Sequence, residues 1–251
     1  MRYKLLGKSG LRVSELALGT MTFGEEWGWG ASKEECHAMF DAFAEAGGNF
    51  VDTANRYTEG TSEKLVGEFT AADRDHFVVA TKYTLFTRRD DPNAAGNQRK
   101  NMVQSLEASL KRLGTGYVDL YWVHAWDFVT PIEEVMRGLD DLVRAGKILY
   151  IGISDTPAWI VSRANMLAEL RGWSQFVGLQ VRYSLLDRAG ERDLLPMARA
   201  RHRRDGVGRT GHRHLDWQIQ QEPGRKGPGW HVEFGRCSQP GCCGRGDTGC
   251  S

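Results

Sequence analysis

The sequence predicts an α/β protein of the (β/α)8 barrel class, with an N-terminal β-hairpin and an incomplete set of barrel units. Short apolar runs, typical of strands buried on both faces of a parallel sheet, alternate with segments of helical period. The first strand ends at Gly19-Thr20-Met21, without the glycine-rich turn of an open dinucleotide-binding sheet. Six strand units occupy about 200 of the 251 residues, so about six of eight units are recognisable.

The predicted elements follow one another in a regular order. A hairpin over residues 3–13 turns at Lys8-Ser9-Gly10. The six apolar runs expected to form the parallel strands are residues 16–18, 49–51, 77–80, 118–123, 148–153 and 176–181. Parallel neighbours need long crossovers, and the amphipathic segments between the runs are long enough to supply them.

Helix boundaries are marked by capping residues. Ser32 and Glu35 have the spacing of a capping box, and a helical apolar stripe follows them. Thr130 and Glu133 have the same spacing and predict a second capping box, with Pro131 in the first turn.

The bulk composition is that of an ordinary globular protein. Hydrophobic residues make up 41% and charged residues 26% of the chain, and the formal net charge is +1. This balance gives no general attraction to nucleic acid or to a membrane surface. There is no apolar run of transmembrane length and no secretory pattern at the start, so we expect a cytoplasmic protein with neither kind of partner.

Polar side chains follow the predicted strands where a barrel has its active site. Asp52, Lys82 and His124 come at or just after strand ends, and Tyr57 follows Asp52 by five residues. This set suits carbonyl reduction, in which a hydride adds to carbon and the oxygen needs a proton. A lysine cation held by a carboxylate lowers the pKa of a neighbouring tyrosine, and a histidine can orient the carbonyl oxygen.

Several separated motifs then carry a family resemblance. The segments 3–11, 18–24, 51–57, 80–82, 123–124 and 152–154 resemble the aldo-keto reductase superfamily, and within it the bacterial general oxidoreductases related to potassium-channel β-subunits. The resemblance runs from the hairpin to about Ala200. It implies an NADP(H)-dependent enzyme that reduces aldehydes or ketones to alcohols, and it leaves the particular carbonyl substrate and the oligomeric state open.

The resemblance also implies a role for each matching residue. Tyr57 is the expected proton donor, Lys82 and Asp52 its tuning pair, and His124 the residue that orients the carbonyl. The residues expected to line the cofactor are Gly19, Thr20, Met21, Asp52, Ser154, Asp155 and Gln180. Asp155 stands where the family usually has Asn. Three tryptophans, Trp27, Trp29 and Trp126, either line the substrate mouth or serve ordinary packing.

From residue 201 the character of the chain changes. Residues 201–251 hold eleven glycines and eight arginines but four residues in all of the types Val, Leu, Ile and Met. No helical or strand period predicts an element there, so we expect unpaired edges on the first and sixth strands. The tail contains a G-x-G-x-x-G at 206–211 and a His231, Cys237, Cys242, Cys243 group. Neither the context of the glycines nor the spacing of the cysteines fits a standard dinucleotide or zinc site, so no metal is expected.

The genetic code offers an explanation of the tail. Codons for residues 201–205, read from each second base, permit Asp-Ile-Ala-Val-Thr, and the continuation to Pro223 permits Leu-Thr-Gly-Lys-Tyr. Both resemble the family's seventh strand and the loop after it. The hypothesis is that the reading frame shifts near Ala200, so that residues 1–200 form the barrel portion and 201–251 are out of frame. The alternative functions are then a catalytically inactive remnant, a regulatory protein like a β-subunit, or a metal or nucleic-acid module in the tail.

Resequencing the coding DNA around codon 200 tests the frame hypothesis. Independent reads are expected to differ there in base count by a number that is not a multiple of three, and to continue the barrel sequence through the seventh strand. Independent reads that all encode the tail as printed, in one frame with residues 1–200, would contradict the hypothesis.

Overall fold

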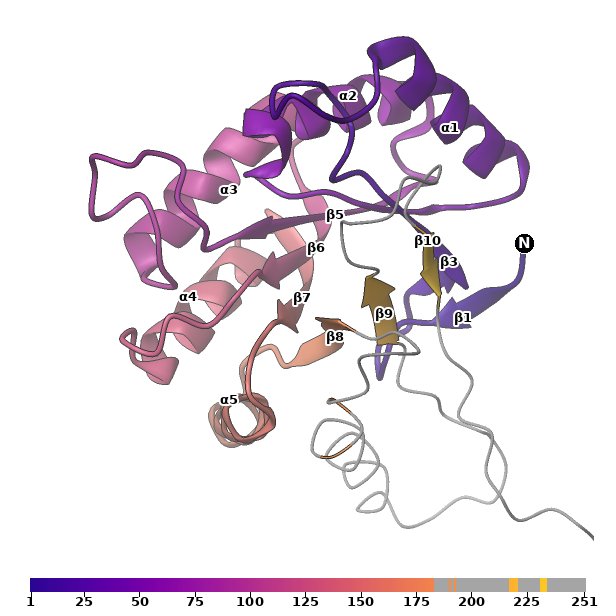
Figure 1. The fold of residues 1–251 in the computed structure, drawn as a ribbon. Helices are drawn as coiled ribbons and strands as arrows, with labels where there is room; N and C mark the ends of the chain where they lie inside the picture. Colours follow the sequence, from indigo (N-terminus) through magenta and orange to yellow (C-terminus); the bar gives the residue numbers. More distant parts are fainter. Residues whose placement is uncertain (183–189, 191, 193–216, 221–230, 234–251) are drawn as a thin grey trace, which may run out of the picture.

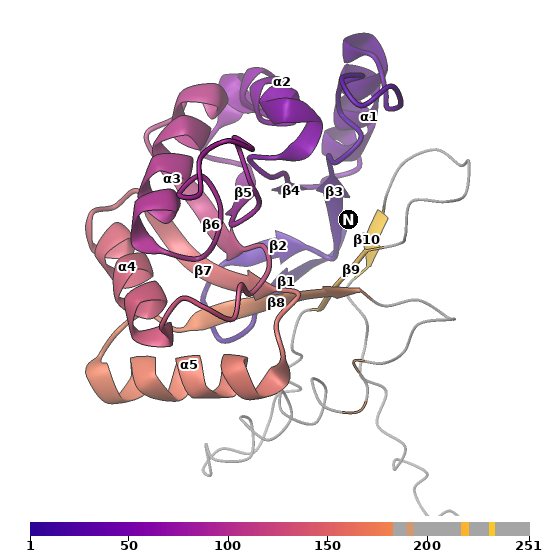
Figure 2. The same cartoon turned by 60° about the vertical axis from the view of Figure 1, so that its left-hand side comes forward.

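The computed structural model describes residues 1–182, 190, 192, 217–220 and 231–233, and in them a parallel sheet curls into most of a barrel (Figures 1 and 2). Six strands pair in parallel and in chain order, as expected for six barrel units. They are β3 (Leu16–Gly19), β4 (Phe50–Asp52), β5 (Val78–Tyr83), β6 (Val118–Val123), β7 (Ile148–Ser154) and β8 (Phe176–Arg182). The predicted barrel class with about six of eight units is confirmed.

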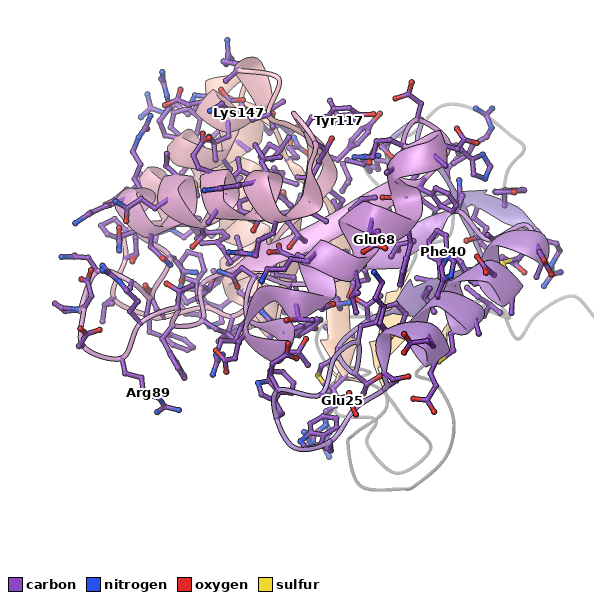
Figure 3. All side chains as sticks on the ribbon, turned by 90° about the horizontal axis from the view of Figure 1, so that it is seen from above. Glu25, Phe40, Glu68, Arg89, Tyr117 and Lys147 are labelled. Carbon is purple, nitrogen blue, oxygen red and sulfur yellow. The ribbon has the colours of Figure 1, made fainter. Side chains whose placement is uncertain are left out.

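Helices cover the outer side of the curled sheet (Figure 2). They are α1 (Lys33–Glu45), α2 (Thr61–Thr70), α3 (Arg99–Leu113), α4 (Ile132–Arg144) and α5 (Ala158–Arg171), with 3-10 turns η1 (Tyr57–Gly60) and η2 (Ala71–Asp73). Figure 3 shows this layer from above with Phe40 of α1 labelled. The centre of the Phe40 ring lies 5.6 Å from that of the Phe69 ring of α2. In the described part of the chain, no helix has the length and apolarity needed to cross a membrane.

The N-terminal hairpin lies against the interior of the barrel. Its strands β1 (Tyr3–Leu5) and β2 (Arg12–Ser14) pair antiparallel, as expected. Two hairpin residues, Leu6 and Val13, are fully buried in a cluster with inward-facing strand side chains. The strand members of this cluster are Ala17, Phe50, Val78, Ala80, Leu120 and Trp122. The hairpin therefore fills one end of the barrel and leaves the carboxyl ends of the strands for chemistry.

One of the two predicted capping boxes is present. The Ser32 hydroxyl accepts from the Glu35 amide, and the Glu35 carboxylate accepts from the Ser32 amide. The second prediction is wrong, because Pro131 and not Thr130 is the N-cap residue of α4, and no side chain caps the helix. The Thr130 hydroxyl instead donates to the Asp127 carboxylate at 2.6 Å, in the loop that precedes the helix.

The expectation of two unpaired sheet edges is also wrong. Strand β9 (Trp217–Gln220) pairs in parallel with β8, and β10 (His231–Glu233) pairs antiparallel with β3. The two tail strands lie beside one another (Figures 1 and 2). A sheet edge offers backbone N–H and C=O groups to any extended segment, so pairing there needs no hydrophobic period. The 206–211 glycines and Cys237, Cys242 and Cys243 lie outside the described residues.

Glycines in two neighbouring strands make room for the largest side chain of the barrel interior. A Cβ added to Gly152 would lie 2.2 Å from Cε3 of Trp122, and one on Gly178 would lie 2.9 Å from its Cη2. The Trp122 ring is 1% exposed, so it has little freedom to move aside.

A Gly152→Ala variant is expected to lose about 1–3 kcal/mol of unfolding free energy, because the new methyl group overpacks the Trp122 ring. Gly116→Ala is the matched control, since an added Cβ there meets nothing within 4 Å, and it should stay within about 0.5 kcal/mol of wild type. Urea denaturation followed by tryptophan fluorescence measures both. Equal midpoints for the two variants would contradict the packing account.

Candidate active site

Parallel pairing of β4 and β5 places the expected carboxylate and lysine of the tuning pair on neighbouring strands. Asp52 is the last residue of β4, and Lys82 lies near the end of β5. The Lys82 ammonium donates to Asp52 Oδ2 at 2.5 Å, to the Thr53 carbonyl at 2.9 Å and to the Tyr57 hydroxyl at 3.1 Å. An ammonium has three donors, and each therefore has an acceptor.

The Lys82 side chain is fully buried, and Asp52 is 1% exposed. Burial lowers the pKa of the Lys82 ammonium, but the charge of Asp52 and the interactions with Asp52 and Tyr57 outweigh it, so the pKa is raised overall. The lysine is therefore a permanent cation at neutral pH. Its charge lies 4.8 Å from the centre of the Tyr57 ring as well as against its oxygen.

His124 directly follows β6 and faces the tyrosine. Its ring centre lies 5.9 Å from that of Tyr57, with the two planes 82° apart. Burial, and then the Lys82 charge, lower the pKa of His124 to about 3. The imidazole is therefore neutral at neutral pH, and such a ring can donate one hydrogen bond without adding a second cation to the site.

Two of the expected cofactor residues lie opposite one another on β7 and β8. Ser154 pairs with Gln180 in the sheet, and both side chains are buried. The Gln180 amide donates to Asp52 Oδ2 at 3.2 Å, which joins β8 to the lysine pair. Asp155 lies just outside, exposed and in a left-handed conformation with φ 36°. Although the residue as a whole is exposed, desolvation of its carboxyl by neighbouring atoms raises the pKa of that group, against the pull of the Arg182 and Lys82 charges.

The loop after β3 contributes the remaining expected residues. Thr20 is fully buried, and its hydroxyl donates to the Asp52 carbonyl at 3.0 Å. Gly19 and Met21, on either side of it, are half-buried. The structure therefore gathers the residues predicted from the sequence at one end of the sheet, around Asp52.

The tryptophans divide between packing and the rim. Trp126 packs against the main hydrophobic core. Trp27 and Trp29 lie 5.5 Å apart in the loop after β3, and Trp29 is 46% exposed. The Trp27 indole donates to the Glu59 carboxylate at 3.2 Å, which ties that loop to the turn bearing Tyr57.

Sequence reasoning missed the buried polar layer behind the site. Ser62 donates to the Thr20 carbonyl at 2.8 Å, and its oxygen also lies 2.8 Å from the hydroxyls of Thr20 and Thr53. Glu63 is fully buried, where it accepts from the Thr81 hydroxyl at 2.5 Å and from Arg112 at 2.6 Å. A charged residue within a helix's apolar stripe was the available signal, since burial requires such a group to be paired.

Comparison with known proteins identifies the chain at this point. The sequence model of the aldo/keto reductase family matches residues 15–216. The chain belongs to the aldo/keto reductase family. The members of that family are (β/α)8 barrels, in agreement with the curled sheet, and the match includes every expected site residue.

Relatives of this aldo/keto reductase are named as reductases and dehydrogenases. The chain is 47% identical over 202 residues to a norsolorinic acid reductase of Emericella nidulans, covering 76% of this chain and 52% of the relative. It is 45% identical over 202 residues to an aryl-alcohol dehydrogenase [NADP(+)] of Phanerodontia chrysosporium, covering 75% and 52%. A norsolorinic acid reductase of Dothistroma septosporum is 42% identical over 239 residues, covering 90% and 60%. The chain thus spans about half the length of the curated relatives it matches.

The lowered pKa of His124 makes the free energy of unfolding depend on pH. Below pH 6.5 the unfolded chain protonates this imidazole while the native chain keeps it neutral down to about pH 3. The unfolded state therefore binds the extra proton, and this residue makes stability rise with pH between about 3 and 6.5. Unfolding free energies of wild type and His124→Gln, measured from pH 4.5 to 7.5, are expected to diverge as pH rises, with the steeper slope in wild type. Parallel slopes would contradict the prediction.

Proposed function

We propose that this site is that of an NADP(H)-dependent oxidoreductase that reduces aldehydes or ketones to alcohols, with Tyr57 as proton donor. One observation carries the proposal: the buried Lys82 ammonium contacts both Asp52 Oδ2 and the Tyr57 hydroxyl. A cation 3.1 Å from a phenol stabilises the negative charge that remains when the phenol gives up its proton.

The residues then divide the work of the reduction. Hydride addition to the carbonyl carbon breaks the C=O π bond and leaves a negative oxygen. Tyr57 gives its proton to that oxygen, and the tyrosine oxygen keeps the electron pair beside Lys82. His124, neutral at working pH, hydrogen-bonds the carbonyl oxygen and orients it toward Tyr57. Asp52 acts through Lys82, which makes it a positioning residue.

The residues at the strand ends fit a nicotinamide cofactor. When bound, the reduced nicotinamide supplies the hydride. Ser154 and Gln180 would hold its carboxamide through a hydroxyl and an amide, and Gly19, Thr20, Met21 and Asp155 would line the rest of its site. Within the described residues, Asp52 Oδ1 and His124 Nδ1 are buried without a hydrogen-bond partner. Buried polar atoms of this kind usually have a partner, and a ligand at the strand ends is a suitable one.

The names of the relatives support the substrate class. Proteins named norsolorinic acid reductase and aryl-alcohol dehydrogenase align with 76% and 75% of this chain. We therefore propose a small carbonyl compound as the substrate, and a cytoplasmic location in keeping with the balanced charge.

The alternative is an inactive remnant or a regulatory protein like a β-subunit. The sequence of the tail supports this alternative. The resemblance implies that the seventh strand and the loops after the last two strands hold the cofactor's ring, pyrophosphate and 2′-phosphate. Residues 217–251 lie beyond the match to the family, and residues 201–216 show no strand period in the printed frame. We propose that the chain as printed binds NADPH weakly or not at all. Tight, saturable fluorescence quenching with aldehyde turnover would refute this.

Tyr57→Phe tests the proton donor, in a version of the chain whose frame is restored after Ala200. The variant keeps the ring and removes the proton, so kcat for an aromatic aldehyde is expected to fall about 10²–10⁴-fold while NADPH binding persists. Tyr121→Phe is the matched control, because its buried hydroxyl donates to the Met102 carbonyl away from the site. NADPH consumption at 340 nm measures both. Equal turnover by wild type and Tyr57→Phe would rule Tyr57 out.

A further inference from the structure

The turn that carries Tyr57 has an unusual backbone. Thr58 (φ 44°, ψ 47°), Glu59 (φ 55°, ψ 27°) and Gly60 (φ 93°) are all left-handed, one after another. Glycine takes this conformation readily, but a β-branched residue such as threonine is a clear outlier there. Such strain persists only where surrounding contacts hold it in place.

The Thr58 side chain supplies two of those contacts. Its hydroxyl is fully buried, donates to the Phe23 carbonyl at 2.5 Å and accepts from the Ser62 amide at 3.1 Å. Phe23 lies in the loop after β3, and Ser62 lies in the first turn of α2. One hydroxyl therefore joins the turn to the elements before and after it.

Both of its partners are themselves fixed. Ser62 donates to the Thr20 carbonyl, and Thr20 donates to the Asp52 carbonyl at the end of β4. A Cβ on Gly24 would lie 3.2 Å from the Thr58 Cβ, so the loop after β3 packs closely on the turn. On the outer side, Arg56 pairs with Glu59, which also accepts from Trp27.

We infer that Thr58 is a positioning residue for Tyr57: its buried hydroxyl holds the strained turn that sets the tyrosine ring between Lys82 and His124. The effect on catalysis rests on the proposed function, in which Tyr57 is the proton donor, whereas the effect on the position of the Tyr57 ring does not. Valine at this position keeps the branched shape but loses both hydrogen bonds. The Phe23 carbonyl and the Ser62 amide are then left buried and unpaired, which favours a different backbone in the turn.

The test is the contact between the Tyr57 and His124 rings, whose centres lie 5.9 Å apart. A nuclear Overhauser cross-peak between them is recorded on the full chain with ring-labelled tyrosine and histidine, and Tyr57→Phe and His124→Gln assign it. The unmodified chain and Thr58→Ser are expected to show the cross-peak, and Thr58→Val is expected to lose it while the other tyrosine signals remain. A cross-peak retained in Thr58→Val, lost in Thr58→Ser or absent from the unmodified chain overturns the inference.

Thr58→Gly covers the case in which Thr58→Val does not fold. Glycine relieves the left-handed strain but lacks the hydroxyl, so loss of the cross-peak is again expected and its retention overturns the inference. The ring contact is measured without cofactor or turnover, so its outcome is separate from that of the proposed function. In the frame-restored chain, Thr58→Val should lower kcat about tenfold or more with little change in KM. Thr58→Ser, which keeps the hydroxyl, should have a kcat close to that of the unmodified chain.

Discussion

The ion pair between Lys82 and Asp52 is the constraint on which the rest of the site depends. Both side chains are buried, and removing two charges from water costs several kcal/mol per ion unless geometry and hydrogen bonds repay it. Every donor of the ammonium has an acceptor, and the Gln180 amide also donates to Asp52 Oδ2. With these partners the Lys82 ammonium keeps its proton despite its burial, and the cation can stabilise a negative charge on the neighbouring tyrosine oxygen.

The barrel supplies the rigidity that this pair requires. Parallel register between β4 and β5 sets the two charged residues on adjacent strands, and β8 brings Gln180 to the same carboxylate from the other side of the curve. The hairpin residues Leu6 and Val13 pack in the interior in one cluster with the Trp122 ring. Packing in the interior thus fixes the strands whose carboxyl ends carry the proposed site, which is the arrangement typical of the fold.

Much of this arrangement follows from the sequence because it rests on periodicity and on strand ends. Runs buried on both faces identified the six strands, and the polar residues after them identified Asp52, Lys82 and His124. Helix α5 carries exposed apolar side chains at Trp159, Met166 and Leu170. Its sequence therefore lacks a clear polar face, and an amphipathic period indicates this helix only weakly.

Other features depend on tertiary contacts that no local pattern encodes. The loop before α4 uses Asp127 to bind Thr130, which removes the hydroxyl that a capping box needs. Thr58 takes a backbone conformation that its residue type disfavours, because Phe23 and Ser62 are in place to bond it. Strands β9 and β10 pair through backbone groups at the sheet edges, so side-chain patterns do not predict them.

A double-mutant cycle on the buried ion pair tests the central claim most directly. Unfolding free energies are compared for wild type, Lys82→Met, Asp52→Asn and the double variant, by urea denaturation at pH 7. The account predicts that Asp52→Asn, which leaves Lys82 as an uncompensated buried cation, costs about 3–5 kcal/mol, and that the double variant costs clearly less than the sum of the single losses. Strictly additive losses would show that the two charges do not depend on one another, and would contradict the account.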